Sequence, residues 1–189
     1  MPALTWPDPL PRYGPIGLRP FHRGDLELVA EFAADPYVPL IGTIPTPYTP
    51  GEGLAYLDRQ HQRLADGTGW SFAIAELATD RAVGGAGLWL HDDASATGGY
   101  AVAASARGRG IATAALTALT EFAWTRPDLD RVELFIEPTN LASITVAERC
   151  GYRRHELIAG HTEIGGIRRD MLRWSATRPP HRQFSADGR

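Results

Sequence analysis

Cysteine is nearly absent from this sequence, and long apolar stretches are absent altogether. The only cysteine is Cys150, which excludes an internal disulfide framework. No run of about 18 apolar residues occurs, and the first 15 residues contain five prolines where a signal peptide would need an apolar segment. We therefore expect a cytoplasmic protein with no membrane partner. Because Cys150 ends an apolar helical pattern, we expect it to be a buried structural thiol rather than a nucleophile.

The sequence also lacks an excess of basic charge and the usual metal-binding patterns. Its formal net charge is −3 and its isoelectric point is about 6.1, so we expect no nucleic-acid partner. None of the six histidines falls into an H-E-x-x-H motif or a closely spaced Cys/His cluster. No metal site is therefore predicted.

Length and composition predict one folded domain with irregular ends. Of the 189 residues, 43% are hydrophobic, which is enough for one core of ordinary size. Prolines make residues 1–15 an irregular N-terminal arm. Residues 177–189 contain Pro179-Pro180 and no apolar periodicity, so we expect a disordered C-terminal tail. The folded body is predicted to span residues 16–176.

Hydrophobic periodicity predicts alternating strands and helices within this body. The predicted elements are a strand over 16–19, a helix over 25–36, a helix with Leu54, Leu57, His61 and Leu64 on one face, strands over 70–77, 82–90 and 98–104, a helix over 109–125, a strand over 131–137, a helix over 140–150 and a hairpin of 152–163 with 167–174. This order predicts an α/β (α+β) fold with a mixed sheet and helices on its faces. The strand, helix and strand over 98–137 imply a parallel pair.

A glycine-rich basic turn is the most informative segment. Arg107, Gly108, Arg109 and Gly110 lie between a predicted strand and a predicted helix. Unpaired N–H groups at a helix start, together with a backbone that can approach closely, are suited to binding a phosphate. The two arginines could contact phosphate, but such side chains also commonly point into water. The turn therefore predicts a phosphorylated ligand bound mainly by the backbone.

Six short motifs recur together along residues 16–174: Arg107, Gly110 and Ala112 of a glycine signature, Leu18-Arg19-Pro20, Gly99-Tyr100, Asn140 with Ser143, Cys150-Gly151-Tyr152, and Arg168-Arg169-Asp170. In these motifs the sequence resembles the GCN5-related N-acetyltransferases (GNAT), and within them the RimJ/RimL ribosomal-protein-alanine acetyltransferases. The resemblance implies a mostly antiparallel, twisted sheet in which one parallel strand pair is splayed around an acyl-CoA site.

The resemblance further implies transfer of an acyl group, acetyl above all, from acyl-CoA to a primary amine. The acceptor would be a protein or peptide N-terminus or a small-molecule amine. N–H groups of the glycine turn would bind the pyrophosphate, while the strand around Tyr100 would pair with the pantetheine arm. The implied acyl-CoA-binding residues are Tyr100, Ala101, Val102, Arg107, Gly108, Arg109, Gly110, Ile111, Ala112, Thr113, Asn140 and Ser143. The N–H near Val102 is a candidate for stabilising the oxyanion.

Two residues are candidates for proton transfer. Ser143 could protonate the departing thiolate, and Glu137 could act as the general base. Local roles remain open, because Asn140 and Ser143 fit a helix N-cap and Glu137 fits a solvated carboxylate. Relatives in neighbouring branches carry a tyrosine acid where this sequence has Ala147. That departure keeps a second hypothesis open, namely a non-catalytic acyl-CoA-binding regulatory protein.

The acceptor site is predicted from position and aromatic character alone. Tyr37 and Tyr48 belong to a proline-rich loop over residues 36–50, and Trp89 ends a predicted strand. Long loops often carry binding surfaces, although such aromatic residues can equally cap a core. We expect these three side chains to line the acceptor pocket. A homodimer is also expected, since related proteins often pair through sheet edges.

Overall fold

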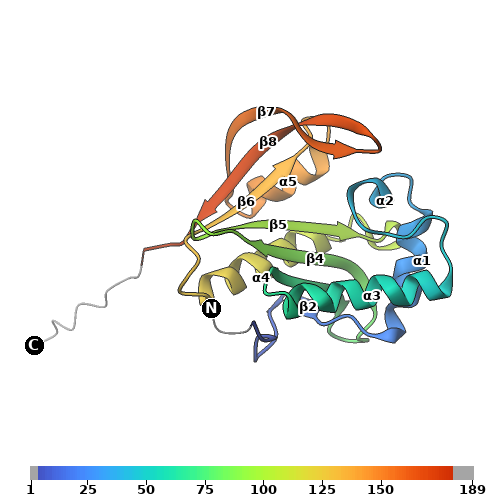
Figure 1. The fold of residues 1–189 in the computed structure, drawn as a ribbon. Helices are drawn as coiled ribbons and strands as arrows, with labels where there is room; N and C mark the ends of the chain where they lie inside the picture. The colour runs from blue at the N-terminus through green and yellow to red at the C-terminus, as the bar shows by residue number, and fades with distance from the viewer. Residues whose placement is uncertain (1–3, 181–189) are drawn as a thin grey trace, which may run out of the picture.

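Eight strands of the described residues form one mixed sheet, with helices packed against it (Figure 1). The structure is a computed structural model that describes residues 4–180. Its elements are β1 (Arg12–Tyr13), β2 (Ile16–Arg19), the 3-10 turn η1 (Arg23–Asp25), α1 (Leu26–Ala34), α2 (Val38–Ile41), α3 (Pro50–Ala65), β3 (Gly69–Glu76), β4 (Ala82–Leu90), β5 (Ser95–Val102), η2 (Ala104–Ala106), α4 (Ile111–Thr125), β6 (Arg131–Ile136), α5 (Leu141–Arg149), β7 (Arg153–Ile164) and β8 (Ile167–Thr177).

The strand order is β1-β2-β3-β4-β5-β6-β8-β7. Among the described strands, β5 and β6 are the only parallel neighbours, and the remaining pairs are antiparallel. The parallel pairing of β5 with β6 covers only Ser95–Arg131, Ala96–Val132 and Thr97–Glu133. Beyond these residues the two strands diverge, as Figure 1 shows. The predicted mixed sheet with one splayed parallel pair is thus confirmed.

Helices α3 and α4 cover opposite faces of the sheet. Phe122 of α4 meets Trp70 and Phe72 of β3 edge to face, with ring centroids 5.0 and 5.7 Å apart. Arg63 of α3 instead donates to the side chain of Ser71, which lies between those two residues on β3. Neighbouring side chains of a strand point to opposite faces, so the two helices lie on different sides.

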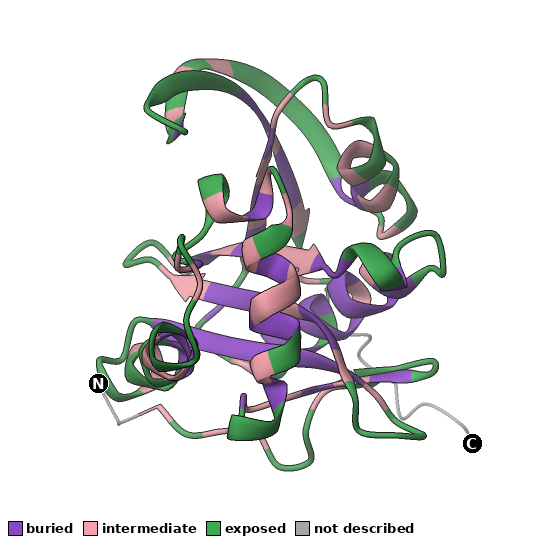
Figure 2. Cartoon of the chain, turned by 90° about the vertical axis from the view of Figure 1, so that its right-hand side faces the viewer, coloured by how far each residue is buried: buried purple, intermediate pink, exposed green. Residues whose placement is uncertain are grey.

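The core lies mainly between α4 and the sheet. Leu116 and Leu119 are fully buried there, and burying each such side chain stabilises the fold by roughly 1.5–3 kcal/mol. In Figure 2 the central strands are mostly buried, whereas the β7–β8 hairpin arches over them and is largely exposed. A Cβ on Gly165 would lie 3.6 Å from both δ-methyl groups of Leu40. The hairpin end therefore approaches α2.

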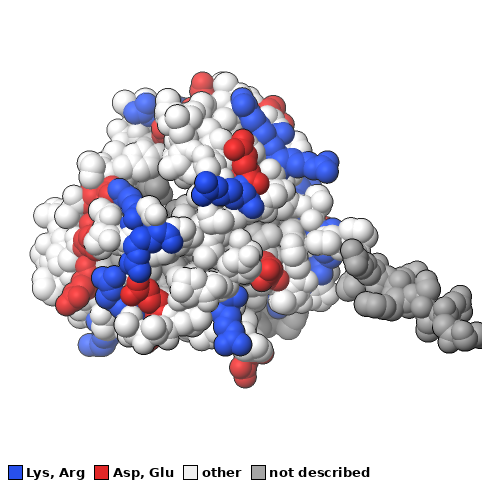
Figure 3. All heavy atoms as spheres, turned by 180° about the vertical axis from the view of Figure 1, so that it is seen from behind, with Lys and Arg blue, Asp and Glu red and all other residues white. Residues whose placement is uncertain are grey.

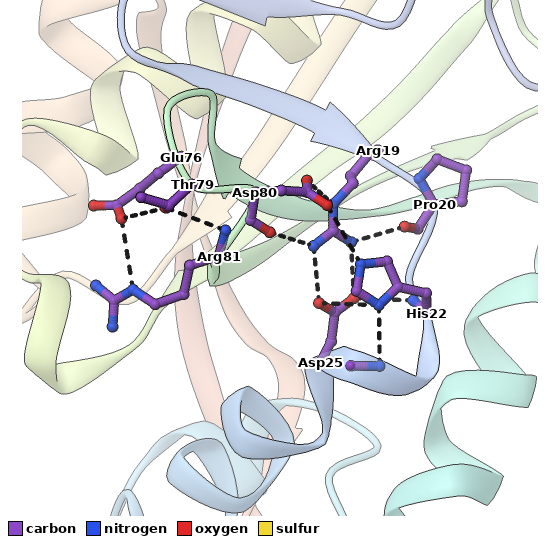
Figure 4. Close-up of polar contacts among 9 residues, drawn as sticks. Arg19, Pro20, His22, Asp25, Glu76, Thr79, Asp80 and Arg81 are labelled. Atoms are coloured by element: carbon purple, nitrogen blue, oxygen red, sulfur yellow. Dashed lines mark hydrogen bonds and ion pairs between the residues drawn. The ribbon is translucent and has the colours of Figure 1, made fainter.

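An ion-pair network fixes the start of the domain (Figure 4). Arg19 of β2 binds both carboxylate oxygens of Asp25, at 2.8 and 2.9 Å, and its Nε binds Asp80 at 2.6 Å. The Asp25 side chain is only 2% exposed. Burial tends to lower the pKa of Arg19, but the two carboxylates outweigh it and raise this pKa. The network joins β2, η1 and the turn between β3 and β4.

Charged side chains of both signs are intermixed on the face shown in Figure 3. Among the ion pairs of the protein, Arg173 binds Glu133 at 2.8 Å and Glu156 at 2.9 Å. Within residues 4–180, no helix combines the length and the apolar character needed to cross a membrane.

Several predicted boundaries were wrong. β5 begins at Ser95, whereas the sequence predicted a loop through Thr97; Ser95 and Ala96 are buried by pairing with distant β6, which local composition does not reveal. α4 begins at Ile111 because Gly110 has a left-handed backbone. The loop over residues 36–50 contains the short helix α2.

The end of the domain lies later than predicted. β8 continues to Thr177, and the Arg178 side chain donates to the carbonyls of Trp124 and Leu129 at 2.7 and 2.9 Å. Thr177 and Arg178, which the sequence analysis placed in the tail, are therefore bound to the folded body. Residues 181–189 of the expected tail lie outside the described residues.

Candidate active site

The divergence of β5 from β6 leaves one edge of β5 open. The N–H of Ala103 donates to the carbonyl of Val83, the residue before the β4 partner of Val102. Backbone groups of successive residues in an antiparallel strand point to alternate edges. Those of Tyr100 and Val102 therefore face the gap rather than β4. An extended, amide-bearing ligand can pair with such an edge as an added strand.

The glycine turn lies at the end of this edge. Gly108 and Gly110 both have φ of +76°, a left-handed conformation that strains other residues. The first helical bond of α4 runs from the N–H of Ala114 to the carbonyl of Gly110, at 3.0 Å. The N–H groups of residues 111–113 therefore have no partner within the helix, and no side chain among residues 4–180 caps them. Such a helix start attracts anions.

Both arginines of the turn bind carboxylates. Arg107 donates from Nη2 to Asp35 at 2.6 Å and from Nε to the Val102 carbonyl at 3.1 Å. Arg109 donates to Glu76 at 2.6 Å. The sequence left contact with phosphate or with water open for these side chains. Both side chains are also 52% exposed, so their contact with phosphate stays a prediction, while their carboxylate pairs hold them beside the turn.

Asp35 connects the glycine turn to the other side of the gap. Its Oδ1 accepts the N–H groups of Tyr37 and Val38 at 2.8 and 3.0 Å, while Oδ2 binds Arg107. Burial tends to raise the pKa of Asp35, but the two N–H groups and Arg107 outweigh it and lower this pKa. The carboxylate thus stays ionised at neutral pH and fixes both segments.

A cavity of about 620 Å³ opens at the gap and reaches both faces of the sheet. Gly87, Trp89 and Gly99 line it from the face covered by α3, whereas Tyr100 and Ser143 line it from the face covered by α4. Neighbours such as Gly99 and Tyr100 point to opposite faces. The cavity therefore passes between the diverging strands, and a molecule on one face can meet one on the other.

Glu137 and Tyr37 line one side of this cavity. Glu137 follows β6, and its Oε1 is buried without a hydrogen-bond partner among the described residues. Burial and the neighbouring Glu137 carboxylate raise the pKa of Tyr37 to about 12, against an opposing effect of Arg169. Tyr37 is therefore a neutral hydroxyl at pH 7, placed beside a carboxylate with a free oxygen.

Tyr100 and Ser143 lie together on the opposite side. The Tyr100 hydroxyl is buried and has no hydrogen-bond partner among the described residues. Burial raises the pKa of Tyr100, and the nearby Ser143 side chain partly offsets that rise. A buried donor without a partner is costly unless something else binds it. This hydroxyl was missed by sequence reasoning, which used only the backbone of Tyr100.

Trp89 forms the floor of the cavity. A Cβ on Gly87 or on Gly99 would come within 2.7 or 2.9 Å of the indole, so both positions need glycine to seat the ring. The two glycines are register partners on β4 and β5. Arg63 of α3 lies over the indole, 5.5 Å from its centroid. Among the described residues, no group of three or more His, Cys, Asp or Glu side chains could hold a metal ion.

Comparison with known proteins identifies this arrangement. Residues 16–153 match the family profile described as Acetyltransferase (GNAT) domain. The chain belongs to the GNAT acetyltransferase family. It is thus an acetyltransferase that moves acetyl from acetyl-CoA to an amine, and the non-catalytic alternative is not favoured. The family that the sequence suggested is confirmed.

Known GNAT relatives cover most of the chain. The "Uncharacterized N-acetyltransferase p20" of Bacillus licheniformis is 24% identical over 163 residues, which is 85% of this chain and 91% of that protein. The structure of Mycobacterium smegmatis RimJ with CoA-disulfide is 26% identical, has a TM-score of 0.76, and the match covers 88% of this chain and 85% of RimJ. RimL, the ribosomal L7/L12 alpha-N-protein acetyltransferase, shares the fold with a TM-score of 0.73 at 17% identity, over 89% and 97% of the two chains.

Within this GNAT fold the predicted site residues meet only in part. Tyr37, Trp89, Glu137, Asn140 and Ser143 all line the cavity. The structure does not bring Tyr48 there, because Tyr48 packs between α1 and α3 and its hydroxyl donates to the Leu26 carbonyl at 3.3 Å.

The N-cap that the local interpretation predicted is present at the start of α5. Asn140 caps α5 by accepting the Ser143 N–H at 3.1 Å, as the local interpretation predicted. Ala147, where relatives carry tyrosine, is fully buried and does not line the cavity. Cys150 is half-buried rather than buried, and its raised pKa, caused by burial, fits a structural thiol.

Proposed function

We propose that this acetyltransferase binds acetyl-CoA along the open edge of β5, with the thioester in the gap between β5 and β6. Backbone groups of Tyr100 and Val102 would pair with the pantetheine amides. N–H groups of residues 108–113 would bind the pyrophosphate, supported by the left-handed glycines and the uncapped start of α4. The Val102 carbonyl is already bound by Arg107, so its N–H is the group left for the ligand.

The observation that carries this proposal is the cavity that crosses the sheet, with a carboxylate oxygen of Glu137 and the hydroxyl of Tyr100 that have no hydrogen-bond partner in the described part of the chain. The acceptor would enter from the face of Trp89 and Tyr37. Its amine would meet the thioester in the gap, where orientation alone removes much of the activation barrier. A cavity reaching both faces suits a reaction between two separately bound substrates.

The proposed step is direct attack. The amine nitrogen bonds to the thioester carbonyl carbon, the carbon–sulfur bond breaks, and the CoA sulfur leaves with the bonding electrons. Glu137 accepts the proton that the amine loses, directly or through water. Tyr100 and Ser143 supply the proton that the thiolate gains, in place of the tyrosine absent at Ala147. A backbone N–H near Val102 would stabilise the oxyanion.

The proposed acceptor is a primary amine, either a protein or peptide N-terminus or a small molecule. Likeness to RimJ and RimL supports an N-terminal amine. Cytoplasmic location is proposed on the single, half-buried free cysteine. The homodimer stays a prediction.

Thiol release from acetyl-CoA in the presence of peptides, amino acids and amino sugars tests this function. All 19 basic residues are arginine, so the enzyme has no lysine of its own to be acetylated and background is low. Mass spectrometry would show the acetylated amine. Absence of turnover with every amine, despite CoA binding in calorimetry, would contradict catalysis; absence of CoA binding would contradict the site.

A further inference from the structure

Arg63 lies on the acceptor side of the cavity, held in one orientation by neutral groups. Its Nη1 donates to Gln60 Oε1 at 2.7 Å and to Ser71 Oγ at 2.6 Å. Gln60 and Ser71 are 3% and 2% exposed. The guanidinium also lies over Trp89, 5.5 Å from its centroid. Buried polar partners and an aromatic face thus fix this cation at the cavity wall.

The charge of Arg63 is not balanced by the part of the chain that the structure describes. None of the ion pairs among the described residues includes Arg63. The charged neighbour one helical turn earlier is Arg59, which carries the same sign of charge as Arg63. Burial, and to a lesser extent Arg59, lower the pKa of Arg63. Burial also raises the pKa of adjacent Tyr56 to about 12, so that phenol stays neutral at pH 7.

Two donors of Arg63 are available to a ligand. Its Nε and Nη2 groups make no hydrogen bond with residues 4–180, and the residue lines the cavity. A half-buried cation with neutral partners is costly until an anion binds it. The planar guanidinium fork matches a carboxylate in a bidentate pair. We propose that Arg63 forms an anion subsite and that the amine acceptor also carries a carboxylate, an inference that rests on the proposed acyltransfer.

The reach of the site limits the size of this acceptor. Trp89 is level with Glu133 through their shared register partner Thr97. Glu137 lies four residues further, or about 13 Å along the strand, while the indole extends part of that way over Gly99. Trp89 and Glu137 also lie two strands apart, at about 4.8 Å per strand, so amine and carboxylate would be separated by on the order of 10–15 Å, the span of about three to four extended residues. A peptide with an acidic residue among its first three positions fits this reach.

Matched peptides test the subsite. Ala-Ala-Ala-amide variants carrying Asp or Asn at position 1, 2 or 3 would be compared as acceptors, and their N-acetylated products as ligands in calorimetry. We expect the preferred Asp peptide to exceed its Asn partner by about tenfold in kcat/KM and in product affinity. Arg63→Gln should reduce that ratio to about one, whereas Arg63→Lys should retain part of it.

The controls separate this inference from the proposed function. Arg59→Gln removes the same charge one turn earlier, where Nη2 binds the Thr43 carbonyl at the surface, and should keep the ratio within about twofold of wild type. Affinity for CoA should be unchanged in Arg63→Gln, which also reports correct folding. The subsite would be overturned if the wild type used or bound the Asp and Asn peptides equally, or bound neither acetylated product. An undiminished ratio in Arg63→Gln would also overturn it. Turnover of other amines would then leave acyltransfer intact.

Discussion

Asp35 binds Arg107 through one carboxylate oxygen, and the two residues, 72 positions apart, join the proposed acetyl-CoA turn to the wall of the acceptor cavity. The other oxygen accepts N–H groups at the start of α2. Because the Asp35 side chain is only 5% exposed, solvent weakens this pair less than it would weaken a surface pair. The Asp35 carboxylate thus holds both the proposed acetyl-CoA turn and the wall of the acceptor cavity.

Replacing Asp35 by asparagine should destabilise the protein in a pH-dependent way. Asparagine keeps an oxygen for the two N–H groups but loses the charge that binds Arg107, so we expect a loss of about 1–2 kcal/mol at pH 7. The folded-state pKa of Asp35 is lowered from 3.8, so its contribution is present above that value and disappears as the pH falls further. Urea unfolding of wild type and variant should therefore converge as the pH falls below about 4. The exposed control Asp58→Asn should show no such convergence; a constant difference for Asp35→Asn would contradict the prediction.

Changing Gly110 should weaken CoA binding far more than changing Arg109. A β-branched residue is strained at φ of +76° and would reorient the N–H groups at the start of α4. We expect Gly110→Val to weaken CoA binding by about tenfold or more, and Arg109→Ala, which loses only the pair with Glu76, by about threefold or less. Calorimetry with CoA measures both. Equal losses would mean that the backbone does not dominate binding.

Sequence reasoning succeeded where the signal is local. The glycine turn was located because glycines, a strand and a helix are adjacent in the chain. The parallel pair followed from strand, helix and strand, and its splaying was implied by the family resemblance. Pairing of Ser95 and Ala96 with β6 was missed, since it depends on residues 36 positions away. Tyr48 was misplaced because aromatic character does not reveal which side of a loop faces the cavity.

The polar partners in the site were invisible in the sequence for the same reason. Nothing near Arg107 in the chain points to Asp35, and the surroundings of Arg63 form only when α3 packs over β3 and β4. The unpartnered hydroxyl of Tyr100 depends on how β5 and α5 meet. One signal was available. The sequence has Ala147 where related enzymes carry a tyrosine, and this difference could have prompted a search for another phenol nearby.

Removing the Tyr100 hydroxyl should slow acetyl transfer without weakening donor binding. Tyr100→Phe keeps the ring but loses the proton donor, so kcat should fall about tenfold to hundredfold while the KM for acetyl-CoA changes by less than about twofold. Ser143→Ala should act in the same direction. If the two hydroxyls form one donor, the double variant should lose less than the product of the single losses. Steady-state thiol release measures all three. An unchanged kcat in Tyr100→Phe, or a raised KM alone, would indicate a packing role.

Replacing Glu137 by glutamine should impair amine activation most strongly at neutral pH. Glutamine has the same shape but accepts no proton, and N-terminal amines are largely protonated at pH 7. We expect kcat/KM for the amine to fall about hundredfold at pH 7, with a smaller loss at pH 9, where more of the amine is already unprotonated. Tyr37→Phe should give a weaker loss, because its hydroxyl only positions the carboxylate. Glu156→Gln, an exposed change on β7, serves as the matched control and should leave the pH profile unchanged. A loss in Glu137→Gln that is equal at both pH values would show that this carboxylate binds the acceptor without taking its proton.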